Sequence, residues 1–143
     1  MFMGEYNHTI DAKGRLIVPS RFREQLGSEF VVTKGLDGCL FVYPKEEWAS
    51  IEAKFRSIPL TAKDARKFLR FFFAGAETYE VDKQGRILIS QEQRKYADLQ
   101  KEVVLAGVLS RIEIWSLKRW QDENTYDDMD EIAEHMAELG LCI

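Results

Sequence analysis

The chain contains an internal repeat, and this repeat constrains its fold more than any other feature of the sequence. Residues 4–26 align with residues 75–97 at an offset of 71, and one inserted residue moves the offset to 72 for residues 31–48. The identical pairs are Gly4/Gly75, Asp11/Asp82, Gly14/Gly85, Arg15/Arg86, Arg23/Arg94, Val31/Val103, Val32/Val104, Gly35/Gly107 and Trp48/Trp120. A period near 70 is too long for a solenoid with two copies. The pattern therefore predicts a duplicated half-domain.

Both copies have the same predicted elements. Strands are expected at 5–10, 16–18, 30–34 and 39–43 in the first copy, and at 77–81, 87–89, 102–106 and 111–116 in the second. A short helix lies between Pro19 and Gly27, and Pro44 starts another that runs to about residue 55. Ser90 and Gln93 have capping-box spacing in the second copy, and a further helix starts at Leu117. Each half has too few strands to close a core alone, so we expect one α+β, mainly β, body with flanking helices.

Residues 61–74, between the copies, are predicted to form an amphipathic helix in which Thr61 and Asp64 make a capping box. An apolar stripe at helical spacing consists of Ala65, Phe68, Leu69 and Phe72, and a basic stripe consists of Lys63, Arg66, Lys67 and Arg70. The basic stripe is either a solvated face or a contact with DNA phosphates or another subunit. The three phenylalanines at 71–73 exceed one helical face, so either both faces are covered or one ring meets another subunit.

Charge is unevenly distributed along the chain. The formal net charge is −4, but residues 121–143 carry eight acids and no Lys or Arg, which leaves a net charge of +4 in residues 1–120. The segment 127–139 looks helical, with acids in its first turn and Gly140 after its end. A net negative charge argues against nucleic-acid binding, but a basic body with a segregated acidic tail removes most of that objection.

The strongest local signal is a doubled Asp-x-x-Gly-Arg motif, Asp11/Gly14/Arg15 and Asp82/Gly85/Arg86. One interpretation is a hairpin turn in which the aspartate accepts backbone hydrogen bonds, the glycine supplies a positive φ, and the aspartate holds the arginine. A plain turn, however, does not need an arginine after the glycine or the lysine that each loop carries, Lys13 and Lys83. The other interpretation is contact with duplex DNA, where paired Arg and Lys loops bind phosphates and read guanine.

Enzymatic function is poorly supported by the sequence. It has no Gly-x-Ser-x-Gly, no phosphate-binding Gly-x-x-x-x-Gly-Lys motif and no His-Glu-x-x-His. The two histidines, His8 and His135, are read as structural, and Cys39 as a small buried apolar residue. Two cysteines about a hundred positions apart exclude a disulfide framework and a cysteine-based zinc module. No cofactor or metal is expected, and the absence of a long apolar segment or signal peptide predicts a soluble cytoplasmic protein without a membrane partner.

The segment 11–19, with Arg21, Arg23 and Leu26-Gly27 after it, is similar to the AbrB-type swapped-hairpin DNA-binding module. The whole chain resembles the MraZ family of bacterial transcriptional regulators through its first six residues, the run 65–75 and the second turn 82–86. The second copy departs from the AbrB pattern, because Ser90 replaces the proline and Glu92-Gln93 replace Arg21-Phe22.

The resemblance implies a double-psi-like β-barrel of the swapped-hairpin AbrB type, built from both repeats. It also implies ring-shaped homo-oligomers that bind short direct repeats in promoter DNA upstream of their own division and cell-wall gene cluster, usually as a repressor in the nucleoid. The AbrB-like repeats are then residues 1–55 and 75–126, with a helical connector at 56–74 and an acidic C-terminal helix at 127–143.

These observations define the expected site. The residues expected to contact DNA are Lys13, Arg15, Arg21, Arg23, Lys83 and Arg86. The residues expected to position the turns are Asp11, Gly14, Asp82 and Gly85. The alternative is an AbrB-like antitoxin or protein-interaction module whose acidic tail docks a basic partner. Such antitoxins usually have one hairpin module and a long disordered tail, whereas this chain has two modules before a short periodic tail.

Overall fold

The computed structural model describes residues 1–141 and residue 143, and its elements alternate as the repeat predicts. The strands are β1 (Phe2–Thr9), β2 (Arg15–Ile17), β3 (Glu29–Lys34), β4 (Leu40–Pro44), β5 (Glu77–Glu80), β6 (Arg86–Leu88), β7 (Glu102–Leu109) and β8 (Arg111–Ser116). The helices are α1 (Ser20–Leu26), α2 (Lys45–Arg56), α3 (Lys63–Phe73), α4 (Gln91–Tyr96), α5 (Leu117–Glu123) and α6 (Met129–Glu138). A short 3-10 turn, Leu36–Gly38, joins β3 to β4.

The two repeats exchange strands. Six strands form one antiparallel sheet in the order β1-β7-β8-β4-β3-β5, and the two shortest strands, β2 and β6, pair with each other. The first strand of each repeat pairs with the third strand of the other, β1 with β7 and β5 with β3. The strand order is therefore unchanged when the two repeats are interchanged. The sequence repeat becomes a pseudo-two-fold relation that passes between β4 and β8 and between β2 and β6.

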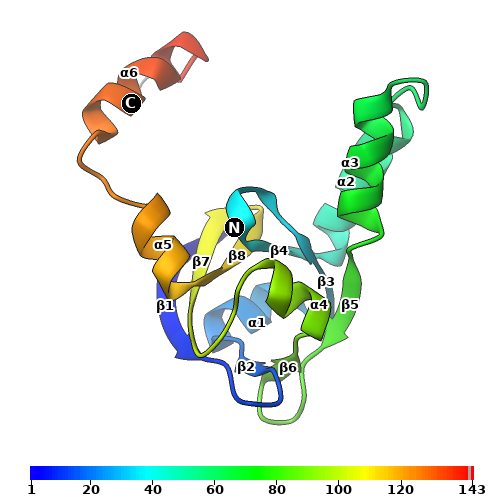
Figure 1. Ribbon diagram of the computed structural model, residues 1–143, viewed down its shortest axis with the longest axis vertical. Helices are drawn as coiled ribbons and strands as arrows, with labels where there is room; N and C mark the ends of the chain where they lie inside the picture. The colour runs from blue at the N-terminus through cyan, green and yellow to red at the C-terminus, as the bar shows by residue number, and fades with distance from the viewer. Residues whose placement is uncertain (142) are drawn as a thin grey trace.

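The larger sheet is open. Its pairing ends at β1 and β5, and no ladder joins these two strands in the part of the chain that the structure describes. Closure into a barrel requires every strand to be paired on both sides, so the closed double-psi-like barrel is not confirmed. The three-residue strands β2 and β6 form a separate two-stranded sheet at the lower end of the molecule (Figure 1), joined to the segment after β1 by a single bridge between Ile10 and Leu16. The coarser expectation, an α+β body that is mostly sheet, is confirmed.

One apolar core is built from both repeats. In the short strands β2 and β6 the residues alternate between core and surface, so that Leu16 and Ile87 are 0% and 2% exposed, whereas β4 is buried on both faces. Phe22 of α1 packs edge-on against the rings of Phe2 and Tyr6 in the same cluster. Full burial of each such side chain contributes about 1.5–3 kcal/mol relative to its exposure. Because the paired strands β2 and β6 bury one of their two faces in this core, the side chains on the other face are directed outward.

Helices α2 and α3 form a hairpin that projects from the sheet (Figure 1). Each of the three phenylalanines at 71–73 contacts an aromatic ring of this chain: Phe71 lies against Tyr96, and Phe72 and Phe73 both lie against Trp48. Phe72 is buried, whereas Phe71 and Phe73 keep part of their surface exposed, so a subunit contact of one of these rings stays a prediction. The basic stripe of α3 is exposed.

The start of α3 differs from the prediction. The N-cap is Ala62, and no side chain caps the helix, so the predicted capping box of Thr61 and Asp64 is wrong. The Arg66 guanidinium instead closes the preceding loop by donating to the carbonyls of Leu60 and Thr61, at 2.9 and 3.1 Å. The cap predicted for α4 is confirmed, since the Ser90 hydroxyl accepts from the Gln93 backbone N–H at 3.3 Å.

The C-terminal helix α6 extends away from the sheet on the segment after α5 (Figure 1). It is slightly shorter than predicted, and none of its residues joins either buried apolar cluster. Met129, Ile132 and Leu139 are exposed along it. None of the helices that the structure describes is long and apolar enough to cross a membrane.

Candidate nucleic-acid interface

The turn between β1 and β2 is organised by one carboxylate. Asp11 Oδ1 accepts hydrogen bonds from the backbone N–H groups of Lys13 and Arg15, at 3.0 and 2.9 Å, and Oδ2 accepts from Arg15 Nε at 2.6 Å. The Gly14 N–H donates to the Asp11 carbonyl at 2.9 Å. This is an Asx-type turn to which an ion pair has been added.

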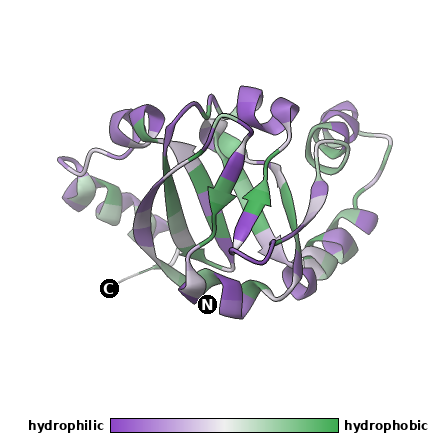
Figure 2. Cartoon of the chain, turned by 90° about the horizontal axis from the view of Figure 1, so that it is seen from below, coloured by the Kyte–Doolittle hydropathy of each residue, from purple (hydrophilic) through white to green (hydrophobic). Residues whose placement is uncertain are grey.

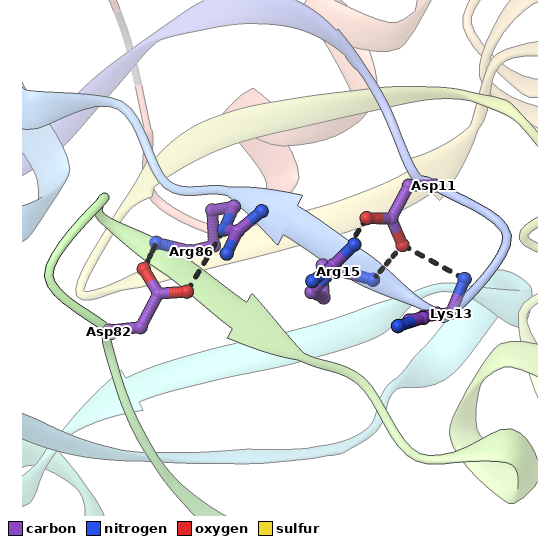
Figure 3. A network of polar contacts seen from close by, with 5 residues as sticks. All are labelled: Asp11, Lys13, Arg15, Asp82 and Arg86. Atoms are coloured by element: carbon purple, nitrogen blue, oxygen red, sulfur yellow. Dashed lines mark hydrogen bonds and ion pairs between the residues drawn. The ribbon is translucent and has the colours of Figure 1, made fainter.

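The turn between β5 and β6 repeats this geometry. Asp82 Oδ1 accepts from the backbone N–H groups of Gln84 and Arg86, both at 2.9 Å, and Oδ2 accepts from Arg86 Nε at 2.9 Å. Figure 3 shows both carboxylates turned toward the arginine of their own turn. In both pairs only Nε is used, and within the described chain the Nη atoms of neither arginine donate a hydrogen bond. The turn chemistry therefore leaves the outer ends of both guanidinium groups available.

The hydrogen bonds also set the charge state of the aspartates. The pKa of Asp11 is lowered from its ordinary value of 3.8 to about 2, chiefly because its carboxylate accepts the Arg15 backbone hydrogen bond. The pKa of Asp82 is lowered for the corresponding reason, with the Arg86 backbone N–H as the largest cause. Both groups are therefore charged at neutral pH, and each one holds an arginine in place.

The paired strands β2 and β6 form a ribbon that carries both turns. Arg15 lies opposite Leu88, Leu16 opposite Ile87, and Ile17 opposite Arg86. Hydrogen bonds extend the pairing past both ends, because Val18 N–H donates to the Gly85 carbonyl and Ile89 N–H to the Gly14 carbonyl, both at 2.9 Å. The two turns are therefore locked to each other across the repeats.

Each turn glycine is packed against an arginine of the other repeat. Gly14 has φ +92°, and a Cβ there would lie 2.8 Å from the Arg94 guanidinium carbon. Gly85 has φ +78°, and a Cβ there would overlap the Arg23 guanidinium. Both positions thus need glycine for its backbone conformation and for its missing side chain. Arg23 and Arg94 thus each lie against the turn of the other repeat and support it.

The expected DNA-contacting residues fall into two groups. Lys13, Lys83 and Arg21 are exposed, and Arg15 and Arg86 are half-buried on the outer side of the ribbon. Arg23 differs from them, because its Nε is buried without a hydrogen-bond partner and its guanidinium lies against Gly85. The structure therefore brings Lys13, Arg15, Lys83 and Arg86 together on the ribbon and its turns, and gives Arg23 a packing contact inside the fold.

Sequence reasoning missed two further residues of this surface. Ile17 and Leu88 lie on the outer side of the ribbon beside the arginines and are 46% and 58% exposed. Figure 2, which views the molecule from below, shows hydrophilic and hydrophobic segments side by side on this pair of strands. The available signal was the period of two in the segment 15–18: with Leu16 and Val18 in the core, Arg15 and Ile17 must face outward.

Neither the Cys39 thiol nor the potential metal ligands of residues 1–141 form a second functional site. The Cys39 side chain is fully buried, its thiol donates to the Leu36 carbonyl at 3.3 Å, and burial raises its pKa. A buried thiol with a raised pKa is unreactive, in keeping with its reading as a small apolar residue. No group of three His, Cys, Asp or Glu side chains within residues 1–141 is arranged to hold a metal ion.

The fold and the ribbon define a class of protein: two intertwined copies of one strand–turn–strand–helix unit that together present a doubled basic turn. The model of the family described as "MraZ protein, putative antitoxin-like" matches residues 1–71 and again residues 72–140. The chain is 62% identical over 141 residues to a protein of Lachnoclostridium phytofermentans named transcriptional regulator MraZ, with 99% of each chain covered. It is 55% identical over 142 residues to the protein of that name from Clostridium tetani, covering 99% of this chain and 100% of the other.

The chain therefore belongs to the MraZ family. The resemblance seen in the motifs is confirmed over the whole length, and each of the two family matches contains one copy of the repeat. Members carry the name of transcriptional regulators, so this protein is a regulator of transcription and not an enzyme.

Proposed function

We propose that this protein is a sequence-specific DNA-binding repressor of its own division and cell-wall gene cluster, which acts as a ring-shaped homo-oligomer on short direct repeats in promoter DNA. The observation that carries the proposal is the ribbon on which Asp11 and Asp82 hold Arg15 and Arg86 through Nε, so that the Nη atoms of both arginines make no hydrogen bond within the described chain. The proposal needs no cofactor, and it places the protein on the nucleoid.

The dimensions of the ribbon suit the major groove, which is about 12 Å wide and admits a two-stranded β-ribbon. Arg15 and Arg86 are diagonal neighbours across β2 and β6, a spacing of about 7–8 Å in antiparallel pairs. A guanidinium fork pairs with O6 and N7 of guanine, so each arginine is assigned to one guanine. Lys13, Lys83 and Arg21, which are exposed at the turns and on α1, are assigned to phosphates.

The distribution of charge favours this assignment. The acids of residues 121–143 lie mainly on α6 and its approach, and this segment and the ribbon lie at opposite ends of the molecule in Figure 1. The ribbon lies within residues 1–120, which carry a net charge of +4. An anionic duplex is attracted to that end, even though the whole chain is acidic.

Assembly into a ring supports affinity by multivalency. One protomer offers two basic turns, and each makes only a few phosphate contacts. Identical turns on one face of a ring engage successive repeats at a high effective concentration. Light scattering at micromolar concentration is expected to give a mass of several times 16.6 kDa. A mass of one chain under these conditions would remove the ring from the proposal.

Substitutions at Arg15 test the assignment of the ribbon. If Arg15 pairs with guanine, Arg15→Ala should cost about 1–3 kcal/mol per bound subunit and relax specificity at that base pair. Arg15→Lys keeps the charge but loses the planar fork, so a guanine contact suffers and a phosphate contact survives. Lys13→Ala should weaken binding to operator and random DNA alike and reduce the dependence on salt.

These titrations use a duplex selected by the parent protein from a random pool, at a fixed salt concentration, after thermal melting has shown that each variant is folded. If the ribbon is only a stable turn, Arg15→Ala lowers the melting temperature while affinity per folded protein stays the same. A folded Arg15→Ala protein that matches the parent on the selected duplex would overturn the assignment of the ribbon as the DNA-reading site.

The second candidate is an antitoxin-like or protein-interaction role, which the words "putative antitoxin-like" in the family description favour. The exposed apolar residues of α6, among them Met129 and Ile132, lie beside its acids and suit a basic protein partner. The two roles differ in the region that they need. An interaction role requires α6 and tolerates Arg15→Ala, whereas DNA binding requires Arg15 and tolerates removal of α6.

A further inference from the structure

The outer side of the ribbon holds two apolar side chains that the fold itself does not use. Ile17 and Leu88 are 46% and 58% exposed, and neither belongs to the two apolar clusters that the structure describes. Isolated apolar residues on a surface are ordinary and need no explanation. These two, however, occupy equivalent positions in the two repeats, each of them two residues after the arginine of its turn.

Strand pairing places each apolar side chain beside an arginine of the other repeat. Leu88 lies directly opposite Arg15, and Ile17 directly opposite Arg86. The core-facing residues Leu16 and Ile87 fix this orientation, because a change of register by one residue would expose both of them. The outer side of the ribbon thus carries two pairs of side chains. In each pair, an arginine held by its aspartate lies across the strands from an aliphatic side chain and within contact range of it.

Such a pair matches the chemistry of neighbouring bases in the major groove. Arginine recognises O6 and N7 of guanine, and an aliphatic side chain packs against the C5-methyl group of thymine. The same groove displays no other apolar group that distinguishes one base pair from another. Isoleucine and leucine side chains make no hydrogen bonds. At the centre of a proposed DNA-reading surface, the base group that they can recognise is therefore this methyl group.

We infer that Ile17 and Leu88 are specificity residues that contact thymine C5-methyl groups next to the guanines read by Arg86 and Arg15. The inference rests on the proposed function and extends it, because it assigns two further residues and the base that they read. It also states what the recognised sequence contains: each guanine that depends on an arginine of the ribbon has a thymine within two base pairs, on one strand or the other.

Uracil substitution tests the inference without any change to the protein. In the duplex that the parent protein selects from a random pool, thymines near the arginine-dependent guanines are replaced one at a time by deoxyuridine, which lacks only the methyl group. Fluorescence anisotropy at fixed salt is expected to show a loss of affinity of about fourfold per contacted methyl, the factor that follows from burial of one such group. Thymines outside the site serve as the control and should show no loss.

Protein variants complete a thermodynamic cycle. Ile17→Ser and Leu88→Ser are expected to weaken binding to the thymine duplex, and replacement of the contacted thymine by uracil should then cause no further loss. Leu36→Ser is the matched control, since Leu36 is 54% exposed in the turn between β3 and β4 and outside the ribbon. It should retain both the parental affinity and the parental response to uracil.

The outcomes separate the two levels of the proposal. If the parent selects a duplex and Arg15→Ala loses it, but thymine and uracil duplexes bind equally, the methyl contact is wrong and the proposed function stands. Selected sequences without thymine beside the arginine-dependent guanines also overturn the methyl contact. If the parent protein selects no duplex at all, both the proposed function and the methyl contact are wrong. Should a serine variant fail to fold, the uracil series still decides.

Discussion

At the scale of single residues, the contact between Gly85 and Arg23 gives a test in which one substitution relieves another. Gly85→Ala introduces strain at φ +78° and a collision with the Arg23 guanidinium. We expect a loss of about 1–2 kcal/mol from the strain and a further loss because the Arg23 guanidinium, whose Nε is buried, must move aside. In an Arg23→Ala background only the strain remains, so the penalty for Gly85→Ala should be smaller there. Equal penalties in both backgrounds, measured by urea unfolding, would contradict the packing of Arg23 beneath this turn.

The aspartates of the turns predict how stability depends on pH. The folded-state pKa of Asp11 is lowered to about 2 from 3.8, and that of Asp82 is lowered as well. A lowered folded-state pKa means that the stabilisation is complete above about pH 4 and is lost as the pH falls toward 2. Asp11→Asn and Asp82→Asn should reduce the urea midpoint at pH 7 and flatten its decline below pH 4. An unchanged slope in the double variant would show that other groups control the acid transition.

At the scale of elements, Gln93 connects α4 to the sheet through a buried set of hydrogen bonds. Its side chain is 1% exposed, donates to the carbonyls of Val32 and Gly75 at 2.9 and 3.0 Å, and accepts from the Tyr79 hydroxyl at 2.9 Å. Gln93→Ala removes the partner of the buried Val32 carbonyl and of the part-buried Gly75 carbonyl and Tyr79 hydroxyl, so we expect a loss of about 1–3 kcal/mol in the free energy of unfolding. Gln91→Ala, at an exposed position of the same helix, should stay within about 0.5 kcal/mol of the parent. Similar urea midpoints for the two variants would show that Gln93 does not anchor the helix.

At the scale of the whole molecule, the acidic tail should modulate affinity for DNA without supporting the fold. Removal of residues 125–143 deletes six acids and no Lys or Arg, and raises the net charge from −4 to +2. Binding to a random duplex should tighten several-fold at low salt, with the difference shrinking as salt screens the charges. The melting temperature should not change, because no residue of α6 joins the buried clusters. A drop in melting temperature would reveal a packing role for α6. A full-length chain in which the same six acids are neutralised to Asn or Gln separates charge from length.

Much of the fold and the basic residues of the candidate site could be predicted from the sequence alone, whereas Ile17 and Leu88 were missed. The order of elements, the Ser90 cap, the family and the doubled Asp-x-x-Gly-Arg turn all follow from the sequence: from alternation of apolar residues, turn chemistry and a recognisable internal repeat. The local sequence pattern gave a wrong prediction at the start of α3, where a side-chain cap and another loop contact are both compatible with the same few residues. Thr61 and Asp64 had the spacing of a cap, but Arg66 closes that loop by a contact five and six residues away.

What the sequence by itself determined is therefore the repeat, its turns and the residues that the turns hold. Only the tertiary structure decided that β1 pairs with β7 and β5 with β3, that the larger sheet stays open, and that Arg23 supports the turn of the other repeat. Two half-domains with the same pattern of elements can pair within or across copies, so local propensity cannot choose between these pairings. Within the β2–β6 pair, the shared burial of Leu16 and Ile87 fixes the register and turns Ile17 and Leu88 outward beside the arginines.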